Sequence, residues 1–355
     1  MDHRLLFPVF LSALVGCFGG KDDTEPDSGP ESDPLQADLL IVLDNSPSMY
    51  DEAGTLGLGF DDLAASLPAD IDFHLAVTTV SADPEDDADG DGSVIEPGEV
   101  GTFLGRGAFT SSGDWASELR RTVLCEGTCW PGECQGEDTA GCIPYDPSYE
   151  CGDDPGEQVT WDYLECICGS DWEPPQCGSG TEEGLEAALL ALCRAASSPP
   201  ASCFDHSGSP LSQDDAGSNP GFLRPDTPTV VLILSDEGDG SRGLSQGDDD
   251  PQDYLDLFQE IGGALSIAVV GPAYDSEAHT FECNSGGATS WGTGRYQQAA
   301  EITGGFYAVI EECTAPDGTC SGPDNGYCVP TDFEGVWSSL VDLLQAGAGD
   351  VNGWW

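Results

Sequence analysis

The run Leu39-Leu40-Ile41-Val42-Leu43 is followed at once by Asp44-Asn45-Ser46-Pro47-Ser48, and these ten residues are the most informative about the fold. Five consecutive apolar residues are typical of a strand that is buried on both faces of a parallel sheet. The Asp, Asn, Ser and Pro residues that come next favour a tight polar turn. We therefore expect a buried central strand, with order beginning near Ala37, that ends in a loop rich in oxygen atoms.

The rest of the chain alternates apolar runs with helical periodicity. Further strands are predicted at 73–80, 229–234, 265–270 and 306–310. Helices are predicted at 60–67, 181–195, 251–261, 295–303 and 333–346. This alternation predicts an α/β fold: a doubly wound, mostly parallel sheet of five or six strands with helices on both faces.

One long segment, residues 83–177, interrupts the alternation. It is rich in Gly, Pro and Asp and holds eight cysteines. We interpret it as an insertion that lacks a core of its own and is held by disulfides. A strand at 101–104 and a helix at 115–124 are expected to belong to the parent fold, and smaller cysteine-bearing insertions are expected at 274–290 and 312–330.

Cysteine usage indicates an oxidising compartment. Of 15 cysteines, 14 lie between Cys125 and Cys328, and only four histidines accompany them. Their spacings do not repeat the C-x-x-C pairs of structural zinc sites, so disulfides account for them better. The sequence leaves the pairing open.

The N-terminus predicts export. The apolar run at 5–15 is too short to span a bilayer and fits the core of a signal peptide. It ends in Leu14-Val15-Gly16-Cys17, which resembles the bacterial lipobox. That resemblance implies a signal at 1–16 and an acylated Cys17; an ordinary secretory signal cut nearby is the alternative. Residues 17–36 are expected to form a flexible acidic tether, 37–347 the folded domain, and 348–355 a tail.

The charge of the chain limits the classes of partner that it is expected to bind. With 66 acidic residues against 9 basic ones, the formal net charge is −57. Such a polyanion repels nucleic acid and anionic lipid headgroups and attracts cations. We expect contact with the membrane through the lipid anchor only.

Oxygen-bearing side chains follow several predicted strands. Asp44, Ser46 and Ser48 follow the first, Thr181 opens a predicted helix, and Asp236 follows the run at 229–234. Ligands of open α/β sheets bind at the carboxyl ends of strands. Carboxylate and hydroxyl oxygens suit Mg²⁺, Mn²⁺ or Ca²⁺ rather than zinc. Taken alone, D-x-S-x-S is also explained by turn and helix-cap preferences.

As a set, these residues resemble the metal-ion-dependent adhesion site of the von Willebrand factor A (VWA) family. That family has D-x-S-x-S after the first strand, a threonine before the third helix and an aspartate after the fourth strand. The resemblance covers roughly residues 37–346 apart from the insertions. It implies a divalent cation, Mg²⁺ or else Mn²⁺ or Ca²⁺, with an open coordination position that a partner's carboxylate fills.

The resemblance also implies a role for each residue. Ser46 and Ser48 are expected to ligate the cation directly, and Asp44 to order the loop and reach the metal partly through water. Thr181 is expected to ligate the cation in a high-affinity state, and Asp236 to act mainly through water. Pro47 and Glu237 depart from the family's pattern, the second by adding a charge beside Asp236.

A second metal candidate lies in the long insertion. The loop Asp87-Ala88-Asp89-Gly90-Asp91-Gly92-Ser93 resembles the first half of an EF-hand calcium loop. Glu99 comes one position late for the last ligand, and no clear helix precedes the loop. A structural Ca²⁺ site with ligands at Asp87, Asp89, Asp91, Ser93 and Glu99 and a plain solvated acidic loop are both open.

Together these features predict a non-enzymatic binding protein, anchored by lipid at the bacterial cell envelope, at the outer membrane or cell surface. It is expected to bind a protein partner that offers a carboxylate through its cation. The alternative is a surface scaffold that metal and disulfides only stabilise. A third reading, a hydrolase using Ser245 in Gly243-Leu244-Ser245-Gln246-Gly247, is set aside because that motif does not follow a strand directly.

Overall fold

The structure is a computed structural model, and the residues it describes lie within the unit Pro34–Trp355. The described residues are 35–82, 98–105, 107–134, 142–153, 155–156, 158–175, 177–178, 182–204, 210–211, 219–241, 251–262, 264–272, 274–275, 280–281, 294–313, 328–330 and 332–349.

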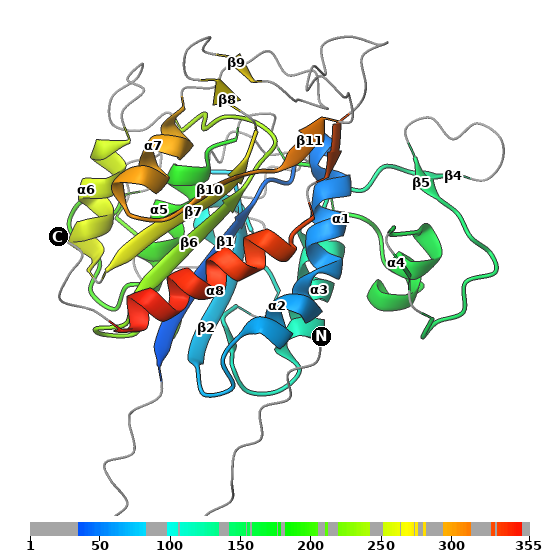
Figure 1. The fold of residues 1–355 in the computed structure, drawn as a ribbon, viewed down its shortest axis with the longest axis horizontal. Helices are drawn as coiled ribbons and strands as arrows, with labels where there is room; N and C mark the ends of the chain where they lie inside the picture. Colours follow the sequence, from blue (N-terminus) through cyan, green and yellow to red (C-terminus); the bar gives the residue numbers. More distant parts are fainter. Residues whose placement is uncertain are drawn as a thin grey trace, which may run out of the picture. The chain divides into compact units, whose positions relative to one another are not determined.

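A six-stranded sheet, in the order β10-β7-β6-β1-β2-β3, forms the centre of this unit (Figure 1). Its strands are β1 (Gln36–Leu43), β2 (Asp72–Thr79), β3 (Phe109–Thr110), β6 (Thr229–Leu234), β7 (Leu265–Gly271) and β10 (Tyr307–Val309). All neighbours run parallel except β2 and β3, which are antiparallel. Chain order reverses at β1, so β1 and β6 are central neighbours from distant parts of the sequence.

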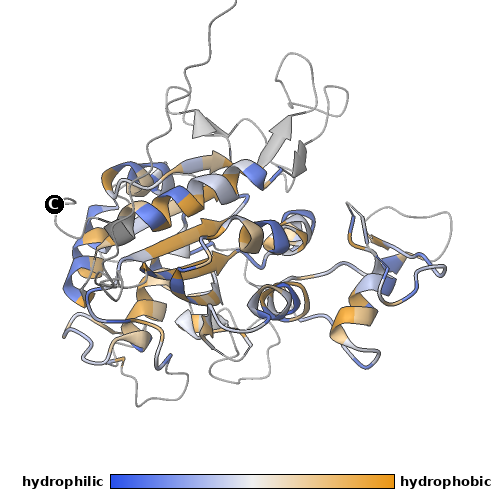
Figure 2. Ribbon diagram, turned by 60° about the horizontal axis from the view of Figure 1, so that its bottom comes forward, coloured by the Kyte–Doolittle hydropathy of each residue, from blue (hydrophilic) through white to orange (hydrophobic). Residues whose placement is uncertain are grey.

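Both faces of the sheet are buried, as a continuous apolar strand requires. Along β1, Leu39, Ile41 and Leu43 point into one apolar cluster, and Leu40 and Val42 point into another. Successive side chains of a strand point to opposite faces, so one strand contributes to both. Figure 2 shows the strands as the most hydrophobic part of the unit, between helices that are hydrophobic on one side.

Helices cover both faces. The first cluster draws on α1 (Tyr50–Leu58), α2 (Phe60–Ser66), α3 (Trp115–Glu126) and α8 (Glu334–Gly349). The second draws on α5 (Gly184–Ala195), α6 (Gln252–Ile261) and α7 (Arg295–Ile302). The expected α/β class, with a mostly parallel sheet between helices, is therefore confirmed.

The expected strand at 101–104 is wrong. Residues Glu99–Gly101 form a 3-10 turn, η3, and the sixth strand is β3 instead. Val100 and Gly101 have φ angles of 49° and 73°, which end extended structure. A Cβ on Gly101 would lie 2.4 Å from the backbone nitrogen of Ala191, so this turn packs directly onto α5.

The described residues between 127 and 178, in the cysteine-rich part of the long insertion, form a small module beside α1 and α3. It contains a two-stranded sheet, β4 (Glu133–Cys134) with β5 (Ile143–Pro144), and α4 (Trp161–Cys168). Four disulfides hold it: Cys125–Cys168, Cys129–Cys177, Cys134–Cys142 and Cys151–Cys166. A fifth, Cys193–Cys203, lies beside α5. The prediction of disulfides is confirmed.

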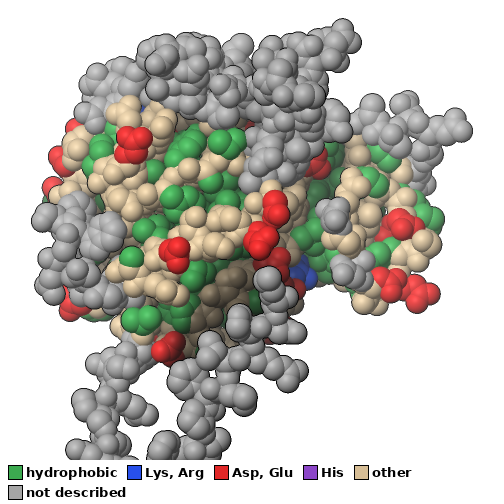
Figure 3. All heavy atoms as spheres, in the orientation of Figure 1, with side chains coloured by type: hydrophobic (Ala, Val, Ile, Leu, Met, Phe, Trp, Pro, Cys, Tyr) green, Lys and Arg blue, Asp and Glu red, His purple; other side chains and the backbone are tan. Residues whose placement is uncertain are grey.

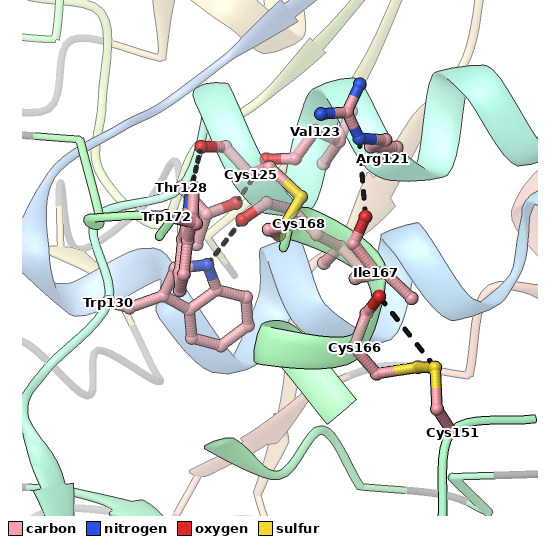
Figure 4. The surroundings of a disulfide bond; sticks show 11 residues. Arg121, Val123, Cys125, Thr128, Trp130, Cys151, Cys166, Ile167, Cys168 and Trp172 are labelled. Carbon is pink, nitrogen blue, oxygen red and sulfur yellow. Dashed lines mark hydrogen bonds between the residues drawn. A yellow bond between two sulfur atoms is a disulfide. The ribbon is translucent and has the colours of Figure 1, made fainter. Parts of the chain in front are cut away.

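The module has a core, contrary to expectation. A third apolar cluster joins Leu124 of α3 to five buried module residues: Trp130, Ile143, Val159, Tyr163 and Leu164. Figure 4 shows the Cys125–Cys168 bond among indole and backbone groups: Trp172 donates to the Cys125 carbonyl at 2.8 Å and Trp130 to the Leu124 carbonyl at 2.6 Å. The tryptophans of this segment were the overlooked sign of a core, because each fills a large volume and donates its N–H to a hydrogen bond when buried.

Two further strand pairs are small: β8 (Tyr274–Asp275) with β9 (Thr280–Phe281), and β11 (Glu311–Cys313) with β12 (Cys328–Pro330). Among the described helices, none has the length and apolar content needed to cross a membrane. On the face that Figure 3 shows, acidic side chains are scattered over the described residues, with far fewer basic ones.

Candidate metal centre

The carboxyl ends of β1 and β6 lie side by side. Leu43 pairs with Leu234 in the parallel ladder, and the Asp44 N–H donates to the Leu234 carbonyl at 2.9 Å. The loop after β1 and the loop after β6 therefore start at the same edge of the sheet. Ligands of open α/β sheets bind at such an edge, where the strand order reverses.

Asp44 joins these two loops. Its carboxylate is fully buried; Oδ1 accepts a hydrogen bond from the Ser46 N–H at 2.8 Å, and Oδ2 accepts one from the Ser235 hydroxyl at 2.6 Å. The first bond shapes the turn, and the second ties it to the chain after β6. Asp44 thus orders the loop.

The two serines of D-x-S-x-S present their hydroxyls together. Ser46 Oγ and Ser48 Oγ are 3.0 Å apart. Pro47 opens a 3-10 turn, Pro47–Met49, at a position where its fixed φ is suited to a helix start. This turn folds Ser48 back toward Ser46 and brings two hard oxygen atoms to one point.

The loop after β6 adds carboxylates. Asp236 is 1% exposed and follows Ser235, whose hydroxyl accepts a hydrogen bond from the Glu237 N–H at 3.1 Å. Glu182, 3% exposed, shares a side-chain hydrogen bond with Glu237, and its carbonyl accepts from the Gly240 N–H at 2.6 Å. The start of α5 is therefore joined to the loop that carries Asp236.

Several predicted ligands lie outside the described residues: Thr181, Asp87, Asp89, Asp91 and Ser93, together with Cys17 and Ser245. Glu99 begins η3, but its side chain also lies outside them. The helix expected from 181 begins at Gly184. Of the five predicted adhesion-site residues, the structure brings Asp44, Ser46, Ser48 and Asp236 to one edge of the sheet.

Excess negative charge is buried at this edge. Burial raises the pKa of Asp44 to about 6, although the hydrogen bonds from Ser235 and Ser46 lower it. Burial, then the charge of Asp44 and the contact with Glu237, raises the pKa of Glu182 to about 10. Proximity of like charges in a dry environment favours protonation of one of them. A bound cation would favour the ionised forms instead.

A neighbouring network positions the start of α5. Asp239 is buried and accepts hydrogen bonds from the Leu185 N–H at 3.2 Å and the Ser241 hydroxyl at 2.7 Å. Its other oxygen accepts from Arg295 of α7 at 2.8 Å. Sequence reasoning missed this aspartate, although it lies three residues after Asp236. Its partner Arg295 is distant in sequence, so no local pattern revealed the pair.

The disulfide module contacts the D-x-S-x-S loop. The Gly178 N–H donates to the Asn45 carbonyl at 3.0 Å, and a Cβ on Gly178 would lie 2.3 Å from Asn45 Oδ1. Cys177, the residue before, is bonded to Cys129. The insertion therefore borders the candidate metal centre.

The donor set fits a hard divalent cation. Within the described residues, no group of three or more His, Cys, Asp and Glu side chains is placed to hold a metal ion. The candidate centre is of another kind, since hydroxyl oxygens make up half of its described donors. Two hydroxyls close together, beside several buried carboxyl groups, form an environment that suits a hard cation.

Comparisons with known proteins identify no family. No family model and no curated protein matches the chain. A solved structure that it matches is that of proximal thread matrix protein 1 from the mussel byssus, with 11% sequence identity and a TM-score of 0.31. The match covers 89% of this chain but 48% of the mussel protein, about half its length. At that similarity, neither fold nor function is transferred.

Proposed function

We propose that this chain is a VWA-like binding protein that holds a divalent cation at the edge formed by β1 and β6. Ser46 and Ser48 would hold the cation directly, with Thr181, and Asp44 and Asp236 would act largely through water. When bound, the cation supplies an electrophilic position for a carboxylate of a partner protein. The two hydroxyl ligands carry no charge, so they would leave positive charge on the cation for that carboxylate.

The observation that carries this proposal is the 3.0 Å separation of the Ser46 and Ser48 hydroxyls on a turn held by Asp44. A turn needing only a cap would use one hydroxyl, whereas this one holds two hydroxyls side by side. Ser235 then ties Asp44 to that loop. These contacts match what the resemblance to adhesion sites implies.

The proposal extends to location. Five disulfides support an oxidising compartment, because such bonds are rare where thiols are kept reduced. We propose that the chain is exported and attached to the cell envelope through an acylated Cys17. Its acidic surface would then face partners across the medium, and a cation would allow it to bind an acidic group despite that charge.

The test is a calorimetric titration of Mg²⁺, Mn²⁺ and Ca²⁺ into EDTA-treated protein and its Ser48→Ala variant. Ser48 is half-buried, and its hydroxyl forms a hydrogen bond with that of Ser46, so the variant should fold. Loss of one ligand typically weakens a metal site severely; we expect at least about a tenfold loss, the scale seen even for indirect supports of metal ligands. Ser338→Ala, an exposed serine of α8, is the matched control.

Equal cation binding by the wild type and Ser48→Ala would overturn the metal proposal and assign the cation to diffuse surface charge. Cation binding at this edge that only raises the melting temperature, with no gain in affinity for a carboxylate-bearing peptide, would favour the scaffold alternative. That second readout separates metal binding from metal-mediated recognition.

A further inference from the structure

A cavity of about 350 Å³ opens between α1 and the disulfide module, and none of the carboxylates of the candidate metal centre lines it. Four residues of α1 and six of the module line it, among them Tyr50, Asp51, Gly54, Trp130, Ile143 and Val159. Ligand pockets in proteins range from about 300 to 1,000 Å³, so this one is small. It suits one long side chain rather than a large cofactor.

The cavity has an apolar floor. Trp130, Ile143 and Val159 are buried members of the module's apolar cluster. Gly54 brings α1 close to this floor, since a Cβ there would lie 3.3 Å from both Trp130 and Val159. The floor offers a surface for a chain of methylene groups.

The rim is polar and carries negative charge. Asp51, Pro144 and Gln158 are exposed, and Asp51 forms a hydrogen bond with the Tyr50 hydroxyl. A carboxylate accepts up to about four hydrogen bonds, so Asp51 retains capacity for a ligand. None of the ten lining residues is Lys or Arg.

Two aromatic rings add to this preference for a cation. The Tyr50 and Trp130 ring centroids are 6.4 Å apart, and both rings line the cavity. The faces of Trp and Tyr rings attract ammonium and guanidinium groups. Lysine and arginine combine such a head with an apolar stem, which they bury while the charge stays at the surface.

We propose that this cavity binds a lysine or arginine side chain of a basic partner protein, with the stem on the Trp130 floor and the head beside Asp51. The net charge of −57 favours approach of such a partner. Tyr50 lies two residues after Ser48, so the pocket begins where the D-x-S-x-S loop ends. The site requires no metal and stands independently of the proposed cation.

The test uses the full folded chain in EDTA and the peptide acetyl-Gly-Arg-Gly-amide, with binding followed by saturation-transfer NMR. The same peptide with citrulline in place of arginine keeps the shape and removes the charge. Measurements at an ionic strength of about 0.15 M, where the Debye length is about 8 Å, suppress diffuse attraction. We expect the citrulline peptide to bind at least about fivefold more weakly, since a cation–π contact contributes roughly 1 kcal/mol.

Asp51→Asn is the site variant and Asp62→Asn its matched control. Both aspartates are exposed and lie in the first turn of a helix, so the substitutions change net charge and helix-end electrostatics alike. Asp51→Asn should weaken the arginine peptide at least about threefold, the effect of losing an exposed ion pair. Asp62→Asn should leave its affinity within experimental error.

Three outcomes would overturn the proposal: no detectable binding of the arginine peptide, equal binding of arginine and citrulline peptides, or equal effects of Asp51→Asn and Asp62→Asn. The last would assign binding to overall charge. Because EDTA is present throughout, none of these results bears on the metal centre.

Discussion

The sheet and the disulfide module reach stability by different routes. The sheet buries two large apolar clusters, one on each face, and the cysteine pair Cys193–Cys203 is an addition beside α5. The module has a much smaller apolar cluster, and four disulfides link cysteines between positions 125 and 177. A small core seldom stabilises a fold alone, so covalent links replace part of the missing burial. Both regions border the candidate metal centre: the sheet through the ends of β1 and β6, and the module through Gly178.

The largest expected effect is in the sheet region. Trp337 of α8 is 1% exposed, and its ring lies 5.7 Å from that of Phe60 and 5.5 Å from that of Phe333. Trp337→Ala should lower the free energy of unfolding by about 3–5 kcal/mol, because the cavity left in a packed core closes only partly. Urea unfolding measures this, with exposed Ser338→Ala as the control. A loss below about 1 kcal/mol would show that burial of apolar side chains is not the main source of the stability of the sheet.

A smaller, local effect is expected in the module. Replacing both Cys125 and Cys168 by alanine removes a link across 43 residues and should destabilise the module by about 2–4 kcal/mol. Hydrogen exchange should show lost amide protection in α4 while β1 and β6 keep theirs.

The matched variant replaces both Cys193 and Cys203 by alanine, a pair separated by 10 residues beside the packed α5. It should leave protection in α5 largely intact, since the second apolar cluster holds that helix. Equal loss of amide protection in both double variants would show that the sheet region depends on its disulfide as much as the module does.

The smallest expected effect is a pH dependence confined to the sheet edge. The folded-state pKa of Glu182 is about 10 and that of Asp44 about 6, both above their ordinary values. The contribution of such acids to folding stability is fully present below their pKa in the unfolded chain, about 4. It is lost as the pH rises toward their pKa values in the folded protein. Between pH 6 and 7, the unfolding free energy of cation-free protein should fall by about 1–2 kcal/mol.

Urea unfolding in EDTA, compared with Glu182→Gln, isolates this contribution from general charge repulsion. The variant should show a shallower decline with pH. If the decline of the variant equals that of the wild type, Glu182 and the buried acids beside it are not the source of the pH dependence. Module protection, followed by hydrogen exchange, should change less with pH.

Most of the sheet was predictable from local sequence patterns. The runs that became β1, β2, β6 and β7 were evident because a strand buried on both faces must be apolar throughout. Asp44, Ser46, Ser48 and Asp236 were found for a related reason: polar residues directly after such runs lie at strand ends, and strand ends of parallel neighbours meet at one edge.

Other elements were decided by tertiary packing. Helix α1 was not predicted, because Gly54 and Gly57 weaken a helical pattern. The structure uses both glycines for close approach: a Cβ on Gly57 would lie 2.7 Å from Leu124, and one on Gly54 would meet Trp130. Those neighbours come from segments about 70 residues away and are invisible to local propensity.

The pairing of charges and cysteines was likewise a tertiary outcome. No residue near Asp239 in the sequence indicates that it pairs with Arg295. The 15 cysteines likewise allow many pairings. Local pattern sets which residues are buried and where strands end, because those depend on one segment's periodicity. Which distant groups then meet depends on how the segments pack, and that is what placed Gly178 beside Asn45 and opened a cavity beside Asp51.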